Sequence, residues 1–218
     1  MSKRITRSEE AIPSDVLQRL SPVVLKAFSE LDFHRVDMRT IAREAGMSFA
    51  TIYRHFVDKE ALLFWFIDHW TEDLYARALQ VLDTDQGALT KLQEYFRVHL
   101  EFYQERPEVG RVIFMTVPLV RWMTDESYRT QEPSRRLLRI IEQGQTAGEI
   151  RADVTKVDVF DLWSGLFNRA FLMWQFRGRS YSLIDRWEAL NRVAIDGVVA
   201  ERGVLAAKKS PPAARRRS

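Results

Sequence analysis

Residues 38–59 have the sequence MRTIAREAGMSFATIYRHFVDK, and they define the architecture better than any other segment of the chain. The first part predicts a short helix, because Ile41 and Ala45 are spaced to lie on one helical face. Gly46 follows where a helix can end in a left-handed residue, which glycine adopts without steric cost. Ser48 then offers a hydroxyl that can cap a second helix. The pattern therefore predicts two short helices joined by a tight turn.

The second helix is expected over residues 49–56 and is apolar on one face only. Ile52 and Phe56 lie four residues apart and are the predicted buried positions. The opposite face carries small and polar side chains, namely Ala50, Thr51, Tyr53, Arg54 and His55. Two such helices with a glycine-containing turn form a helix-turn-helix. Periodicity alone leaves open an ordinary helical hairpin with a polar outer face.

The side chains of the second helix suit the major groove of DNA. Ala50 and Thr51 are small enough to let the backbone approach the bases, so residues 49–51 are expected to read the sequence. Tyr53, His55 and Lys59 can reach phosphate oxygens, which fixes the position of the protein on DNA. The residues expected to contact DNA are Arg39, Thr40, Ser48, Phe49, Ala50, Thr51, Tyr53, Arg54, His55 and Lys59.

The run IAREAGMSFATIYRHFVDKEALL, residues 41–63, resembles the signature of TetR-type regulators, the tetracycline-repressor family. Shared elements are Ile-Ala, Ala-Gly-hydrophobic-Ser, a small residue before Thr, aliphatic-Tyr, His-Phe and Lys-Glu-x-Leu, in that order. The resemblance covers about the first third of the chain. It implies an all-α fold of about nine helices, with an N-terminal three-helix helix-turn-helix domain. A larger helical domain for ligand binding and dimerisation would follow.

The hydrophobic pattern stays helical beyond the motif and divides the chain into four expected parts. Residues 1–12 would be a mobile arm and 13–60 the DNA-binding domain. Residues 61–204 would bind the effector and dimerise, and 205–218 would be a disordered basic tail. Residues 61–82 are apolar on several faces, which predicts a helix that packs on both domains.

The composition excludes several classes of site. The 218 residues are 46% apolar and include no cysteine, so disulfides, thiolate catalysis and cysteine-type zinc sites are excluded. The four histidines stand singly, and no nucleophile elbow or glycine-rich phosphate loop is recognisable. We therefore expect no enzymatic activity, no cofactor and no metal. With no signal peptide and no apolar run of roughly 20 residues, a cytoplasmic protein without membrane contact is expected.

The charge is unevenly distributed along the chain. The net charge is +3, yet residues 201–218 hold six basic side chains and one acidic side chain. The rest of the chain therefore carries −2, and the high isoelectric point is a property of the tail. The DNA prediction rests on the motif and not on overall charge.

Aromatic residues are concentrated between positions 88 and 177, where rings can either fill a core or line an apolar cavity. The resemblance favours a cavity that holds an effector, with Asn168 as a polar anchor. The residues expected to line it are Phe96, Phe102, Tyr103, Phe114, Trp122, Trp163, Phe167, Asn168 and Phe171. The resemblance also implies a homodimer through the last two helices, expected at 156–177 and 183–203.

These expectations combine into one leading interpretation. The chain would be a repressor that binds a palindromic double-stranded operator as a homodimer and is released by a small, largely apolar effector. One alternative is a DNA binder of the same fold without ligand-controlled release. The other is a helical protein-interaction module.

Overall fold

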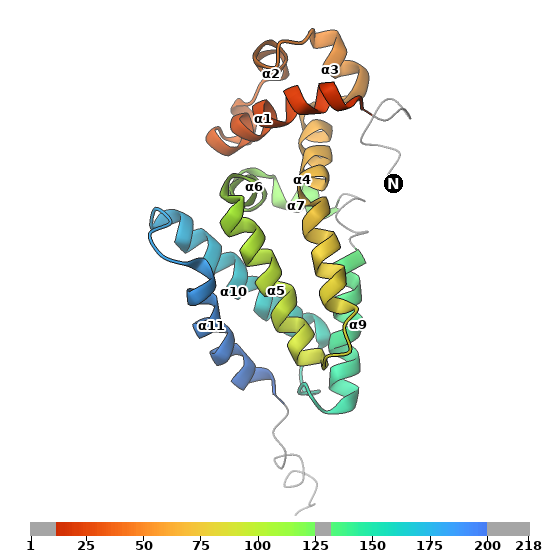
Figure 1. The fold of residues 1–218 in the computed structure, drawn as a ribbon, viewed down its shortest axis with the longest axis vertical. Coiled ribbons are helices and arrows are strands. Elements are labelled where there is room, and N and C mark those ends of the chain that lie inside the picture. Colours follow the sequence, from red (N-terminus) through yellow and green to blue (C-terminus); the bar gives the residue numbers. More distant parts are fainter. Residues whose placement is uncertain (1–11, 125–131, 200–218) are drawn as a thin grey trace, which may run out of the picture.

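The computed structural model describes residues 12–124 and 132–199, and for Leu119, Arg121 and Trp122 the backbone only. The described residues are almost entirely helical and form a small N-terminal bundle above a longer helical body (Figure 1). The all-α prediction is confirmed. The expected N-terminal arm and basic tail lie outside the described residues, except for Ile12. None of the described helices combines the length and the apolar character needed to cross a membrane.

The N-terminal bundle contains α1 (Ser14–Glu30), α2 (Met38–Glu44) and α3 (Phe49–His55), with a short 3-10 turn at Phe33–Arg35 between α1 and α2. Local signals set these boundaries. Asp37 accepts a hydrogen bond from the Thr40 amide at 3.0 Å and starts α2, while Ser48 accepts one from the Thr51 amide at 3.0 Å and starts α3. Between the two helices Gly46 has φ +62°. The predicted helix-turn-helix is confirmed.

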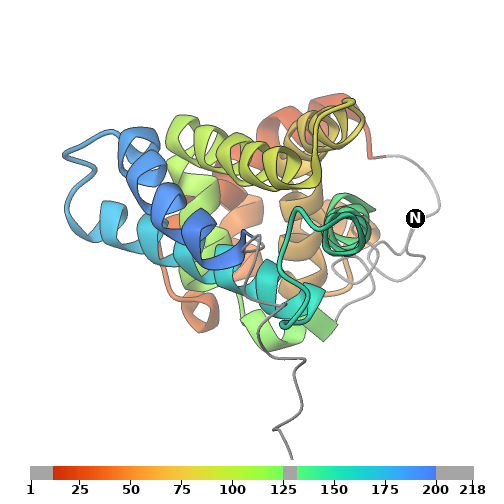
Figure 2. The same cartoon turned by 90° about the horizontal axis from the view of Figure 1, so that it is seen from below.

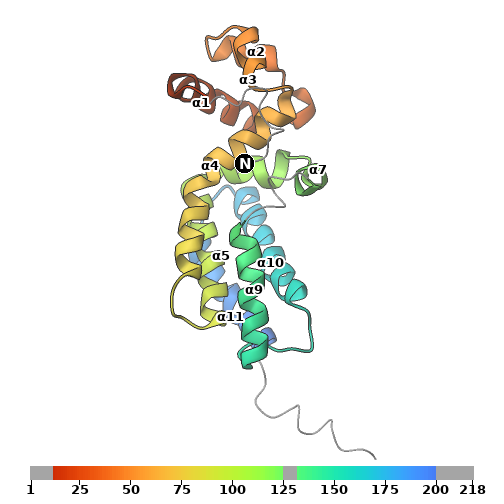
Figure 3. The same ribbon diagram turned by 90° about the vertical axis from the view of Figure 1, so that its right-hand side faces the viewer.

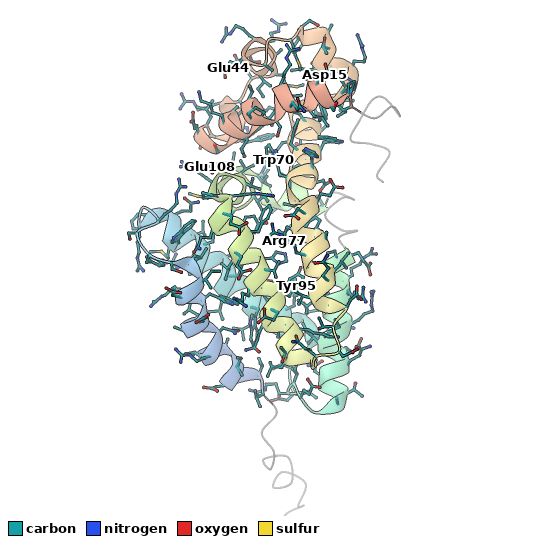
Figure 4. The ribbon with its side chains drawn as sticks, viewed as in Figure 1. Asp15, Glu44, Trp70, Arg77, Tyr95 and Glu108 are labelled. Atoms are coloured by element: carbon teal, nitrogen blue, oxygen red, sulfur yellow. The ribbon has the colours of Figure 1, made fainter. Side chains whose placement is uncertain are left out.

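The helix α4 (Lys59–Leu82) runs without a break from the bundle into the body (Figure 1). It begins at Asp58, whose side chain accepts hydrogen bonds from the amides of Glu60 and Ala61. The helix contacts α1 at one end and α5 and α9 at the other, as its all-round apolar sequence predicts. Trp70 lies where bundle and body meet (Figure 4), and its indole N–H donates to Ser21 Oγ of α1 at 2.8 Å.

Four long helices build most of the body together with the end of α4: α5 (Ala88–Glu105), α9 (Glu132–Ala147), α10 (Lys156–Phe176) and α11 (Leu183–Val198). They run roughly along the long axis of the molecule, with α9 and α11 on opposite sides (Figures 1 and 3). From below, α10 and α11 lie side by side (Figure 2), consistent with their extensive contact. The pair α10–α11 therefore forms one flank of the body.

Three short elements cross the body just below the bundle: α6 (Pro107–Arg111), a π-helical turn (Val112–Thr116) and α7 (Leu119–Thr124). Both α6 and the π-helical turn contact α1, so the body meets the bundle here as well as through α4. Gly110 lets α6 approach the core closely. A Cβ at this position would lie 2.4 Å from Cζ of Phe171 and 3.0 Å from Cδ1 of Tyr103.

Candidate DNA interface and effector site

The outer surface of α2 and α3 lies at the end of the molecule away from the body (Figure 1). Most of the predicted DNA-contacting residues lie on this surface. Arg39, Ser48, Phe49, Ala50 and Arg54 are exposed. Thr40, Thr51 and Tyr53 are half-buried.

The polar and aromatic side chains of this surface are held in place by local contacts. The hydroxyls of Ser48 and Thr51 hydrogen-bond to each other at 2.8 Å. The Phe49 ring centroid lies 4.6 Å from that of Tyr53 and 5.4 Å from the Arg39 guanidinium. Phe49 therefore projects from the first turn of α3 with a fixed orientation. The residues that the structure describes leave 37% of the Phe49 surface exposed.

The prediction that His55 faces DNA is wrong. Its side chain is only 6% exposed, and its ring meets the edge of the Phe56 ring at 6.4 Å. Residue 55 lies three positions after the buried Ile52, so both share the inner face of the helix. Among the described residues, His55 Nδ1 has no hydrogen-bond partner.

Lys59 is also used differently from the prediction. Its ammonium donates to the carbonyl oxygens of Phe33 at 2.8 Å and of His34 and Val36 at 3.2 Å each. It also lies 4.7 Å from the Phe33 ring centroid. An ammonium has three N–H donors, and here each has an acceptor within the bundle. Lys59 therefore fastens the start of α4 to the turn between α1 and α2, rather than pointing at a phosphate.

Arg19 of α1 was missed by the sequence analysis, and its guanidinium hydrogen-bonds to the turn of the helix-turn-helix. Its Nε and Nη2 donate to the Ala45 carbonyl at 3.2 and 3.0 Å, and Nη2 also donates to the Gly46 carbonyl. These carbonyls end α2, so one guanidinium of α1 holds the turn that orients α3. The contact spans 26 residues in sequence, and no local pattern signals it.

The body contains a packed cluster of rings, which we call the ring cluster: Phe96, Tyr103, Phe114, Phe167 and Phe171. Their neighbouring centroids are separated by 5.2 to 6.1 Å. These distances are typical of interlocked aromatic pairs, so the rings touch one another. Five predicted effector residues are thus brought together, and in this structure they form a filled core.

The other predicted effector residues are placed differently. Phe102 lies beneath the guanidinium of Arg106 at 4.7 Å, and the Trp163 indole donates to Asn191 Oδ1 on α11 at 3.0 Å. The first contact lies at the end of α5, and the second joins α10 to α11. Asn168 has a buried Oδ1 that accepts no hydrogen bond from any of the described residues. The side chain of Trp122 lies outside the described part of the chain.

The polar groups next to the ring cluster are neutral. Burial lowers the pKa of His99 to about 4, against an ordinary value of 6.5, and its Nδ1 lies 2.7 Å from the Tyr95 carbonyl oxygen. Its ring centroid is 6.2 Å from that of Phe167. Burial also raises the pKa of the Tyr103 hydroxyl. The cluster therefore offers an uncharged, largely apolar environment at neutral pH.

The junction between bundle and body is incompletely filled. A groove of about 690 Å³ lies between α1, α4 and the start of α6, with Leu25, Trp70 and Val109 among its lining residues. Glu108 of α6 borders this groove below α1 (Figure 4).

Residues 25–64, from the middle of α1 to the start of α4, match the family model described as bacterial regulatory proteins, tetR family. This segment is a TetR-type DNA-binding segment. Among curated proteins, the chain is 26% identical to the nucleoid occlusion factor SlmA of Vibrio cholerae over 112 residues, 51% of this chain and 53% of that protein. It is 28% identical to the SlmA of Shewanella pealeana over 79 residues, 36% and 40% of the two chains. The match spans about half the length of these relatives or less.

Solved structures of transcriptional regulators resemble most of the chain. The transcriptional regulator FadR from Bacillus subtilis, in complex with stearoyl-CoA, superimposes with a TM-score of 0.69 at 17% identity, covering 83% of this chain and 98% of FadR. The ketosteroid transcriptional regulator KstR2 of Mycobacterium tuberculosis gives 0.65 at 17% identity, covering 88% and 98%. At such identities the likeness establishes the fold alone.

Proposed function

We propose that this DNA-binding regulator is a repressor that binds a palindromic operator as a homodimer and leaves it when a small apolar molecule enters the body. The observation that carries the proposal is the position of α6. It approaches the ring cluster closely at Gly110 and also contacts α1. A change within the cluster therefore has a direct path to the DNA-binding bundle.

The proposed dimer follows from how little DNA one bundle can read. A single α3 contacts only a few base pairs, and a two-fold axis doubles that number. The outer flank of α10 and α11 is suited to self-association, since Phe176 is 83% and Val193 74% exposed. Gly165 and Gly197 also have open space around them, which allows close approach of partner helices.

Two apolar residues of α10 and α11 would contribute less to such a dimer. Ala170 and Val198 are buried inside the protomer. The exposed Leu162 and Val193, together with the half-buried Leu166 and Leu190, remain available. The flank therefore keeps an apolar stripe even without the two buried positions.

An apolar effector fits the chemistry of the ring cluster. The cluster is uncharged at neutral pH, and the structurally similar FadR was solved with stearoyl-CoA and KstR2 is a ketosteroid regulator. A molecule that separated the rings would displace Phe171 and with it α6. Two half-sites one helical turn apart require recognition helices about 34 Å apart, so a tilt of each bundle weakens binding. A coupling free energy of about 1–3 kcal/mol between effector binding and operator binding would suffice for release.

The test begins with selection of duplexes from a random library by the purified protein. We expect an enriched palindrome, a dimeric mass in sedimentation, and a linear loss of log affinity with log salt concentration. A thermal-shift screen of acyl-CoA thioesters and steroids should then yield a ligand that also releases the operator. A ligand that bound the free and operator-bound proteins equally would contradict the mechanism, because equal affinity shifts no equilibrium.

A second candidate function is DNA binding without ligand control. The close packing of the ring cluster favours it, and so does the similarity to nucleoid occlusion factors. In that case the selection would still enrich a sequence, but Phe167→Ala would leave operator affinity unchanged and no screened molecule would release DNA. A helical protein-interaction module would show no salt-dependent sequence preference at all.

A further inference from the structure

The outer surface of α3 carries an apolar patch that the packing of the bundle does not use. The packing of α3 onto the bundle is provided by Ile52 and His55, followed by Phe56 just beyond the helix, all of which are buried. Phe49 is 37% exposed, and the neighbouring Ala50 is exposed as well. Because the core does not require a phenylalanine here, the ring is available to a partner.

The ring is held for contact rather than free to rotate. Tyr53 lies one turn further along α3 with its ring 4.6 Å away, and the Arg39 guanidinium of α2 lies 5.4 Å from the ring centroid. Two neighbours from two helices therefore limit the orientations of Phe49. A side chain that is already ordered loses little conformational entropy on binding. The exposed Arg39 charge beside the ring suits a phosphate flanking the contacted base.

The chemistry of these side chains selects among the bases. Guanine and adenine are read by paired hydrogen bonds from Arg, Lys, Asn or Gln, and none of residues 49–51 is of these types. Thymine differs in presenting a C5-methyl group in the major groove, and phenylalanine and alanine contact that methyl. We infer that Phe49, with Ala50 beside it, reads thymine methyl groups in each half-site. This inference rests on the proposed operator binding.

The experiment removes the methyl group and nothing else. In the duplex enriched by the selection described above, each thymine of the half-site is replaced in turn by uracil, which keeps every hydrogen-bonding group. At one or two positions we expect the affinity, measured by fluorescence anisotropy, to fall about four-fold for each lost methyl. At the same position 5-methylcytosine should bind more tightly than cytosine.

Variants assign the effect to the side chain. Phe49→Ala should bind the thymine and uracil duplexes equally, whereas Phe49→Leu should keep part of the preference. Arg54→Ala is the matched control on the same helix, and it should weaken binding to both duplexes by the same factor. Phe49 is exposed, so thermal unfolding of each variant should match the parent and exclude misfolding.

Two results would overturn the inference. One is an affinity that is unchanged by uracil at every position of the selected half-site. The other is a thymine preference that persists in Phe49→Ala, because another group would then read the methyl. Failure to enrich any sequence would remove the proposed operator binding and this inference with it, whereas enrichment without methyl dependence would remove the inference alone.

Discussion

Lys59 offers the sharpest test of how the bundle is built, because the structure and the sequence motif assign it different roles. In the structure its ammonium donates to three backbone carbonyls of residues 33–36. A phosphate contact, as first expected, would leave this position free to be replaced without loss of stability. The substitution Lys59→Met keeps the aliphatic stem and removes the charge, so it separates the two roles.

The expected cost follows from the contacts that are lost. A hydrogen bond to a charged group contributes about 1.5–3 kcal/mol, but the three share one half-exposed ammonium, so we take about 2 kcal/mol for the set. The cation–π contact with the Phe33 ring, at 4.7 Å, adds about 0.5–1 kcal/mol. We therefore expect Lys59→Met to lower the free energy of unfolding by about 2–3 kcal/mol.

Urea denaturation measures this loss as a lower midpoint at an unchanged slope. The salt dependence of operator affinity, measured where the variant is still folded, should keep its slope, because no phosphate contact is removed. Arg54→Met is the control: Arg54 is exposed on α3, and its loss should reduce the salt slope by about one unit with little effect on stability. If Lys59→Met unfolded like the parent and instead lost one unit of salt slope, the structural role of Lys59 would be refuted.

Three further predictions concern the body and the tail. Gly110→Ala should lower the free energy of unfolding by about 1–3 kcal/mol in urea denaturation, because the new Cβ would lie 2.4 Å from the Phe171 ring. The control Gly165→Ala has open space around the new Cβ and should be neutral or slightly stabilising. Since burial lowers the pKa of His99 to about 4, the unfolded chain binds the extra proton between about pH 6.5 and 4. Stability should thus be complete above about pH 6.5 and fall as the pH drops towards 4, and His99→Gln should flatten this part of the profile. Deleting residues 205–218 should lower the affinity for random duplex and leave the preference for the selected operator intact, as competition anisotropy would show.

The helix-turn-helix was predictable because its signals are local. Gly46 and Ser48 each act within three or four residues of their own position, and the structure places both as the sequence indicates. The error at His55 has a local cause as well. The outer-face assignment treated the last turn of a short helix as solvent-facing, although spacing from Ile52 predicts burial.

Other features depend on distant pairings that no local pattern contains. The Arg19 contacts span 26 or 27 residues and those of Lys59 span 23 to 26. The packing of the ring cluster is likewise not predictable from local sequence patterns. The composition of residues 88–177 predicts many buried rings, but the volume left between them depends on how α5, the π-helical turn and α10 meet. The sequence therefore indicates which rings belong to the interior of the body, but it does not distinguish a filled core from an effector cavity.

The continuity of α4 has a consequence for how regulators of this kind can exchange parts by recombination. Leu62, Leu63 and Phe66 belong to α4 but are fully buried, and the Phe66 ring lies 6.1 Å from that of Phe56, just after α3. A crossover at the start of α4 would replace these buried residues, so the DNA-binding bundle would pack on side chains from another protein. A chimaera that keeps its operator must carry α4 at least as far as Trp70, whose indole hydrogen-bonds to Ser21 of α1. Lineages that swap sensors should therefore show their breakpoints inside α4, beyond Trp70, and not at the end of the recognisable motif.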